Sequence, residues 1–240
     1  MDAERLRQVI ERFGTGGGVV PHPNLCTICV EVLHVYGVGI SIMSGLNSGP
    51  VCSSSERVRR LEDLQFSLGE GPCHRAFVTR SSVAEPDLAN RLADDWPNYG
   101  PAALDLGACA VFAFPLNVGS GTIGVLTLYQ DVVGLLTDEQ QADGDELCAI
   151  LPAFMTIIQG RADEPVLANE LSDAEAHRAE VHQAAGSTAV QLGIGVDEAL
   201  LRIRAHAYTT DQTVAEVSAE ILARRLRLRD DGWQRSEPHE

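Results

Sequence analysis

The stretch GACAVFAFPLNVGSGTIGVLTLY, residues 107–129, decides the fold. It contains two runs rich in β-branched and other apolar residues, 107–116 and 121–129, separated by the short segment 117–120. Two such runs joined by a short connection containing glycine are typical of an antiparallel hairpin. We therefore predict two neighbouring strands of an antiparallel sheet here.

The residues before this hairpin predict a second one. Residues 38–43 alternate toward a strand, Ser44 and Gly45 begin a turn, and residues 51–53 return as the antiparallel neighbour. Because strands and helices do not alternate with the regularity of a parallel sheet, we predict an α+β fold over residues 20–160, an antiparallel sheet with helices on its faces.

Two helices and a tight turn complete this predicted domain. Residues 23–36 carry a single apolar stripe, and residues 56–66 form a second helix behind the serines at 53–55. Gly69-Glu70-Gly71-Pro72-Cys73 is a tight turn that opens another short helix. Residues 1–19 are expected to form a helical arm before the domain.

The last third of the chain predicts a separate helical domain. A helical stripe at 147–158 is interrupted by Pro152, which should kink the helix or shift its start, and 161–170 is a linker or helix extension. Three helices then follow, at about 171–192, 197–209 and 213–228. Ser172 with Glu175 and Thr213 with Glu216 have capping-box spacing, and 230–240 is expected to be a disordered tail that contains Trp233.

Charge restricts the class of partner. The chain has 18 basic and 34 acidic residues, a formal net charge of −16, which argues against indiscriminate binding of polyanions. Within 224–229, however, four of six residues are arginines, so a local basic patch is expected on an acidic protein.

Cysteine usage and hydropathy suggest a reducing compartment. There is no run of about 18 apolar residues and no signal-peptide pattern at the N-terminus, so we expect a cytoplasmic protein without membrane contact. The six cysteines are then expected to be reduced, with no structural disulfide. Cys26 and Cys29 form a Cys-x-x-Cys pair, but no second pair completes a zinc site, so neither a metal nor a cofactor is expected.

Two stretches resemble known families. The turn at 69–73, Trp96-Pro97 and the runs 114–116 and 123–129 resemble the GAF sensor domains of actinobacterial regulators, across about residues 20–160. A second set of segments resembles the ANTAR family of RNA-binding antitermination domains: residues 181–186, 191–194, 197–200, 203–208 and 214–215. The second resemblance implies a three-helix bundle that binds paired hexaloop hairpins in nascent RNA and prevents terminator formation.

RNA binding requires arginines for phosphates, together with small residues or an aromatic ring where an unpaired base packs. The candidates are Gln183, Ala184, Gly186, Arg202, Arg204, His206, Tyr208, Arg224 and Arg225. The alternative is structural: the small residues allow close helix packing, the tyrosine closes the core and the arginines solvate the surface.

The sensor pocket is expected between the sheet and the helices around the turn, where backbone amides at a helix start suit an anion. Its candidate residues are Gly69, Glu70, Gly71, Cys73 and Phe77. Cys73, which His74 follows, could alternatively be an activated thiol at the start of a helix. The simpler interpretation is that Cys73 is a small buried residue of the core.

The sequence thus predicts a signal-responsive, homodimeric RNA-binding regulator, not an enzyme, that promotes transcription antitermination. Its partners would be tandem RNA hairpin loops and an unknown small-molecule or protein signal, and the helix at 147–158 would mediate dimerisation. Two alternatives stay open: a thiol-based reductase on a GAF-like scaffold, with Cys73 or Cys109 as nucleophile, and a dimeric signalling adaptor that binds no RNA.

Overall fold

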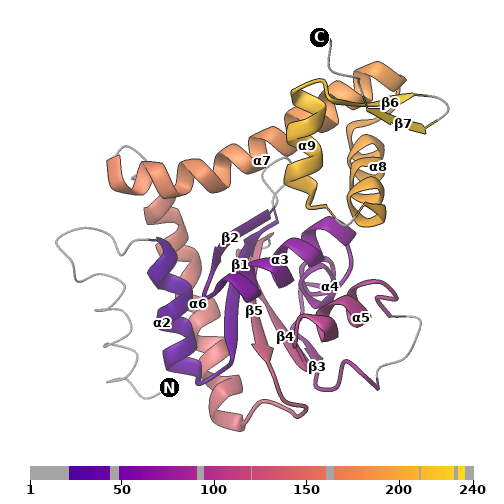
Figure 1. Ribbon diagram of the computed structural model, residues 1–240. Coiled ribbons are helices and arrows are strands. Elements are labelled where there is room, and N and C mark those ends of the chain that lie inside the picture. The colour runs from indigo at the N-terminus through magenta and orange to yellow at the C-terminus, as the bar shows by residue number, and fades with distance from the viewer. Residues whose placement is uncertain are drawn as a thin grey trace. The chain divides into compact units, whose positions relative to one another are not determined.

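The computed structural model describes residues 22–43, 49–90, 95–119, 121–160, 165–210, 212–229 and 232–235 (Figure 1). The predicted arm at 1–19 and the turn at Ser44 and Gly45 lie outside the described residues. The chain divides into two compact units, Met1–Ser172 and Asp173–Glu240.

The N-terminal unit is built on a five-stranded sheet with the order β2-β1-β5-β4-β3, in which every neighbouring pair is antiparallel. The strands are β1 (Gly37–Ile42), β2 (Gly49–Ser53), β3 (Val83–Glu85), β4 (Ala110–Val118) and β5 (Gly121–Gln130). The helices are α2 (His22–Leu33), α3 (Glu56–Leu68), α4 (Pro72–Thr79), α5 (Tyr99–Asp105) and α6 (Asp138–Gly160). Both predicted hairpins are confirmed by the β1–β2 and β4–β5 pairings.

Strand alternation assigns side chains to two layers, because successive residues of a strand point to opposite faces. One face, with Phe112, Phe114 and Leu126, packs against α2 and α6. The other face, with Val111 and Tyr129, packs against α3 and α5, and a smaller cluster joins this face to α4. The predicted α+β arrangement of a sheet flanked by helices is therefore present.

Several element boundaries differ from the prediction. Helix α2 ends at Leu33 rather than Tyr36, and α6 runs as one element from Asp138 to Gly160 with Pro152 inside it. Strand β3 and helix α5 were not predicted, because each is too short to carry a clear hydrophobic period.

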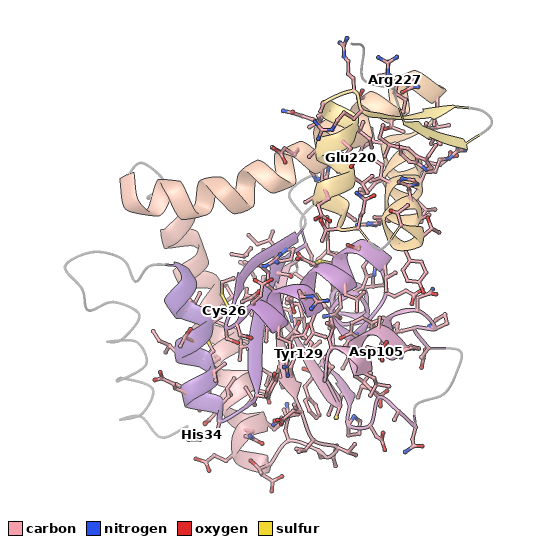
Figure 2. The ribbon with its side chains drawn as sticks, viewed as in Figure 1. Cys26, His34, Asp105, Tyr129, Glu220 and Arg227 are labelled. Atoms are coloured by element: carbon pink, nitrogen blue, oxygen red, sulfur yellow. A yellow bond between two sulfur atoms is a disulfide. The ribbon has the colours of Figure 1, made fainter. Side chains whose placement is uncertain are left out.

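The expectation of no disulfide is wrong in this structure. Cys26 of α2 and Cys52 of β2 are joined by a disulfide, with their Cα atoms 6.1 Å apart (Figure 2). The prediction rested on the compartment, whereas the fold places both side chains in one buried cluster between α2 and the sheet. Four cysteines remain free, of which Cys29 and Cys73 are buried and Cys109 and Cys148 are half-buried.

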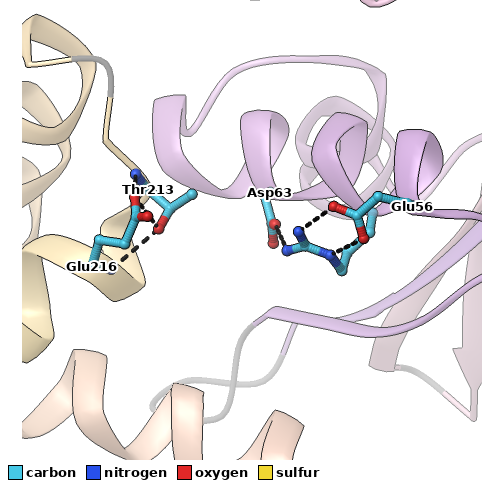
Figure 3. Close-up of polar contacts among 5 residues, drawn as sticks. Glu56, Asp63, Thr213 and Glu216 are labelled. Atoms are coloured by element: carbon cyan, nitrogen blue, oxygen red, sulfur yellow. Dashed lines mark hydrogen bonds and ion pairs between the residues drawn. The ribbon is translucent and has the colours of Figure 1, made fainter.

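The C-terminal unit consists of helices and a terminal hairpin. Its helices are α7 (Pro165–Leu192), which begins in the N-terminal unit's residue range, α8 (Val196–Thr209) and α9 (Val214–Leu222). Strands β6 (Leu226–Arg229) and β7 (Gly232–Arg235) pair antiparallel. Thr213 and Glu216 form the predicted capping box at the start of α9, as Figure 3 shows.

Three predictions about this unit are wrong. The third helix ends at Leu222 instead of 228, because Ala223 caps it and Arg224 adopts a φ of 60° that leaves the helical region. Part of the predicted disordered tail 230–240 forms strand β7. No helix begins at Ser172, since α7 already runs through that position.

None of the helices that the structure describes is both long enough and apolar enough to cross a membrane.

Candidate functional site

The predicted sensor turn connects α3 to α4. Gly69 caps α3 in the left-handed conformation, with a φ of 63°, and its amide donates to the Gln65 carbonyl at 3.0 Å. Gly71 has a φ of 116° and precedes α4, where an added Cβ would lie 2.5 Å from Gln65 Oε1. The backbone therefore requires glycine at position 71 and favours it at position 69.

The structure gives Glu70 and Cys73 internal partners. The Glu70 carboxylate accepts hydrogen bonds from the Asn98 amide at 3.1 Å, Asn98 Nδ2 at 2.8 Å and the Tyr99 amide at 3.2 Å, at the N-terminus of α5. The Cys73 amide donates to Gln65 Oε1 at 2.8 Å. The turn thus ties α3, α4 and α5 together, while anion binding by its amides remains a prediction.

Phe77 is half-buried and packs with Cys73 and Ala76 against Ala113 and Val125 of the sheet. The five predicted sensor residues consequently gather around the start of α4, which packs on the sheet face that carries Ala113 and Val125.

A chain of hydrogen bonds runs through that interior, and we call it the Glu62 network: Ser41, Glu62, Gln65 and Tyr129. Ser41 Oγ donates to Glu62 Oε2 at 2.5 Å, and Tyr129 Oη donates to Glu62 Oε1 at 2.7 Å. Gln65 Nε2 donates to Tyr129 Oη at 2.8 Å, so the chain continues through Gln65 to the Cys73 amide. All four side chains are buried, and Figure 2 shows Tyr129 inside the unit.

The electrostatics of this network follow from its lack of solvent. Burial raises the pKa of Glu62, although the hydrogen bonds from Ser41 and Tyr129 act in the opposite direction. Burial also raises the pKa of the Tyr129 phenol and of the Cys73 thiol well above their usual ranges, and the nearby Glu62 adds to both effects. The environment therefore favours neutral groups throughout.

Glycines in β1 make room for this cluster. A Cβ on Gly39 would lie 2.5 Å from the Glu62 carboxyl carbon, and one on Gly37 would lie 2.3 Å from Val58 Cγ2. The alternation GVGIS in β1 therefore leaves a space on one face that α3 fills with Glu62 and Val58.

Sequence reasoning missed this network. Its signal was present, since Val58, Leu61, Glu62 and Gln65 lie at the spacing i, i+3, i+4 and i+7 of one helix face. Two polar side chains on an apolar stripe, opposite a strand that begins with alternating glycines, indicate a buried polar cluster.

The remaining free thiols are poor nucleophiles or lie away from this cluster. Burial raises the pKa of Cys29 to about 12, and the Cys148 thiol is shifted in the same direction. In the part of the chain that the structure describes, no three His, Cys, Asp or Glu side chains are grouped to hold a metal.

In the C-terminal unit, the predicted RNA-binding residues fall into exposed and buried groups. On α8, the exposed face carries Leu201, Arg202, Ala205 and Tyr208, and the tyrosine is 52% exposed. Arg202 pairs with Glu198 on the same face at 2.7 Å. Tyr208 therefore does not close the core, as the structural alternative required.

The residues on α7 divide in the same way. Gln183 is exposed, whereas Ala184 is fully buried and Gly186 is half-buried. Burial lowers the pKa of His182 on α7, and the positive charge of Arg204 on α8 acts in the same direction. The two side chains therefore lie close together inside this unit. The burial of Ala184 agrees with the alternative in which it allows close helix packing, and its contact with RNA stays a prediction.

The hairpin covers the end of this unit. The Trp233 ring stacks on the His206 ring with centroids 4.6 Å apart, so neither the predicted exposed tail position of Trp233 nor a free His206 ring is observed. Gln191 Nε2 donates to the Leu228 carbonyl at 2.7 Å. Arg224 and Arg225 are exposed where the chain enters the hairpin.

Solved structures share the fold of the N-terminal unit. A GAF domain of a phosphoenolpyruvate-protein phosphotransferase from Coxiella burnetii is 14% identical, with a TM-score of 0.51 over 67% of this chain and 96% of that chain. The corresponding Acinetobacter domain is 12% identical, with a TM-score of 0.49 over 68% and 100% of the two chains. A free methionine-R-sulfoxide reductase from Neisseria meningitidis, in complex with its substrate, is 15% identical, with a TM-score of 0.46 over 63% and 86%.

The similarity to the Coxiella burnetii domain shows the fold alone: the N-terminal unit has the fold of a GAF domain. No model of a known protein family matches the sequence, and no curated protein matches it.

Proposed function

We propose that this chain is a signal-responsive RNA-binding regulator. The GAF-fold unit receives an unknown small-molecule or protein signal, and the C-terminal unit binds hairpin loops in nascent mRNA and thereby promotes transcription antitermination. The observation that carries the proposal is the exposed face of α8, where Tyr208 and Leu201 are 52% and 61% exposed beside Arg202.

An exposed aromatic ring next to an arginine suits an unpaired base. Sequence-specific RNA recognition targets loops whose unstacked bases stack on aromatic side chains, while arginines contact phosphates. A tyrosine needed only for stability would bury its ring in the small core of this unit. The resemblance of residues 181–215 to the ANTAR family supports the same assignment.

The proposal assigns no catalytic step to the chain. A reductase would require a reactive thiolate, and burial raises the pKa of Cys73 well above its usual range, which disfavours that residue as a nucleophile. Cys109 is half-buried and is the remaining candidate for this alternative.

We also propose that the active form is a homodimer. Leu147 and Leu151 of the α6 stripe are fully buried in the N-terminal unit's own core, so these two side chains are not part of the proposed interface. The adaptor alternative retains dimerisation but binds no RNA.

The test is a fluorescence-anisotropy titration of the full chain with tandem-hexaloop RNA and with a loop-scrambled hairpin. We expect preference for the hexaloop RNA, and Tyr208→Ala should weaken this binding about 5- to 150-fold, the loss of about 1–3 kcal/mol of stacking. Tyr208→Phe keeps the ring and should bind as the unaltered protein does. Equal binding of both RNAs would exclude recognition of the loop and with it the proposed function, and binding of neither RNA would also favour the adaptor.

A further inference from the structure

Strand β6 of the C-terminal hairpin alternates buried leucines with arginines. In β6, Leu226 and Leu228 are 1% and 5% exposed, whereas Arg225, which precedes the strand, and Arg227 are exposed. Because alternate residues of a strand point to opposite faces, the leucines face the unit's core and the arginines face away from it. We call Arg225 and Arg227 the arginine row, and Arg229 occupies the next position of the same alternation.

The row is held on an ordered element. Leu228 is opposite Trp233 in the strand register, the Trp233 ring stacks on His206 of α8, and the Leu228 carbonyl accepts from Gln191 of α7. The hairpin is therefore attached to two helices of its unit. Figure 2 marks Arg227 at the outer edge of this unit.

The arginine row has no ion-pair partner in the part of the chain that the structure describes. Neither Arg225 nor Arg227 forms an ion pair with any residue that the structure describes, whereas Arg202 pairs with Glu198 and Arg59 pairs with Glu56 and Asp63. Residues 224–229 contain no acidic residue, and Asp230 and Asp231 follow them in the sequence. Adjacent like charges repel unless an anionic partner neutralises them.

We propose that the arginine row binds the phosphate backbone of the RNA stem beside the recognised loop. This inference rests on the proposed function and adds a second contact, made by an element outside the three helices. Alternate residues of a strand lie about 7 Å apart, a spacing that lets each guanidinium reach a different phosphate. The contact should be independent of base sequence, because backbone contacts position a protein without reading bases.

The experiment is a salt titration of full-chain binding to the hexaloop RNA and to the loop-scrambled hairpin. Arg225→Gln with Arg227→Gln should weaken binding to both RNAs by the same factor and reduce the slope of log affinity against log salt by about 2, one unit for each phosphate contact. Arg59→Gln with Arg60→Gln is the control, because it makes the same change in net charge at exposed positions of α3.

The outcomes separate the two proposals. If the unaltered chain prefers the hexaloop RNA but the hairpin variant keeps its affinity and salt slope, the arginine row is not a binding site and the proposed function stands. Equal effects of the hairpin and α3 variants also overturn the inference, since net charge alone would explain them. If the unaltered chain binds no RNA, both proposals fail.

Discussion

The carboxyl group of Glu62 is shielded from solvent, because only 1% of the residue's surface is exposed. Its two oxygens accept hydrogen bonds from Ser41 and Tyr129. Its folded-state pKa is raised, so the folded protein binds a proton that the unfolded chain has released. The resulting stabilisation is complete below the unfolded-state pKa. It decreases as the pH rises toward the folded-state pKa.

Replacement of Glu62 by Gln should flatten this dependence. The amide resembles the protonated carboxyl and does not ionise, so the free energy of unfolding of the variant should change less between pH 5 and pH 8 than that of the unaltered protein. Chemical denaturation at both pH values measures the difference. Glu31→Gln, at an exposed position of α2, is the control for the loss of one carboxyl group. Parallel profiles for the Glu62 variant and the unaltered protein would show that Glu62 stays ionised.

Gly39 is the second residue on which the network depends. Gly39→Ala should destabilise the N-terminal unit by about 1–3 kcal/mol, the usual cost of overpacking, because the new methyl group would overlap the Glu62 carboxyl. Gly121→Ala in β5 is the matched control, since its Cβ would meet Val118 O at an ordinary 3.7 Å. Thermal denaturation compares the two variants, and equal melting temperatures would mean that Glu62 moves aside at no cost.

At the scale of elements, hydrophobic period predicted the longer pieces. The runs 107–116 and 121–129 correspond to β4 and β5. Ser55 caps the N-terminus of α3, as the serines at 53–55 predicted. The hydrophobic period predicted the wrong element where a segment is short and its pattern is compatible with both a helix and a strand. Residues 226–229 alternate leucine and arginine, which is a strand period, but they follow a helical stripe and were assigned to the helix.

The disulfide shows a different limit of sequence reasoning. Cys26 and Cys52 belong to elements that the sequence predicted correctly, but their proximity depends on how α2 packs on the sheet, which no local pattern encodes. The Glu62 network depends in the same way on the pairing of β1 with α3 and β5. The sequence allowed the individual elements to be predicted, but it did not allow contacts between segments far apart in the chain to be predicted.

Loss of this disulfide should weaken the attachment of α2 to β2. The two cysteines are 26 positions apart in the sequence, so Cys26→Ser with Cys52→Ser should lower the free energy of unfolding by about 3 kcal/mol. Chemical denaturation with and without a thiol reductant measures the effect. The reductant should destabilise the unaltered protein to the level of the variant and leave the variant itself unchanged; equal stability of all four samples would mean that the bond does not form in solution.

At the scale of the whole molecule, two compact units predict two unfolding transitions. Thr213→Ala removes the capping box of α9 and should lower only the C-terminal transition, by about 1 kcal/mol. The cysteine double variant should lower only the other transition. Differential scanning calorimetry of the full chain resolves them, and a shift of both transitions by either variant would show that the units unfold together.

Trp233 determines where a shorter version of this protein has to end. A fragment stopping at position 229, just before the predicted disordered tail, would discard the partner strand of β6 and the ring that stacks on His206. Leu226 and Leu228 would then lose half of their hairpin and expose apolar surface to water. Laboratory work on the isolated helical region should therefore retain the sequence through Arg235, because those last residues belong to the fold that displays the arginines.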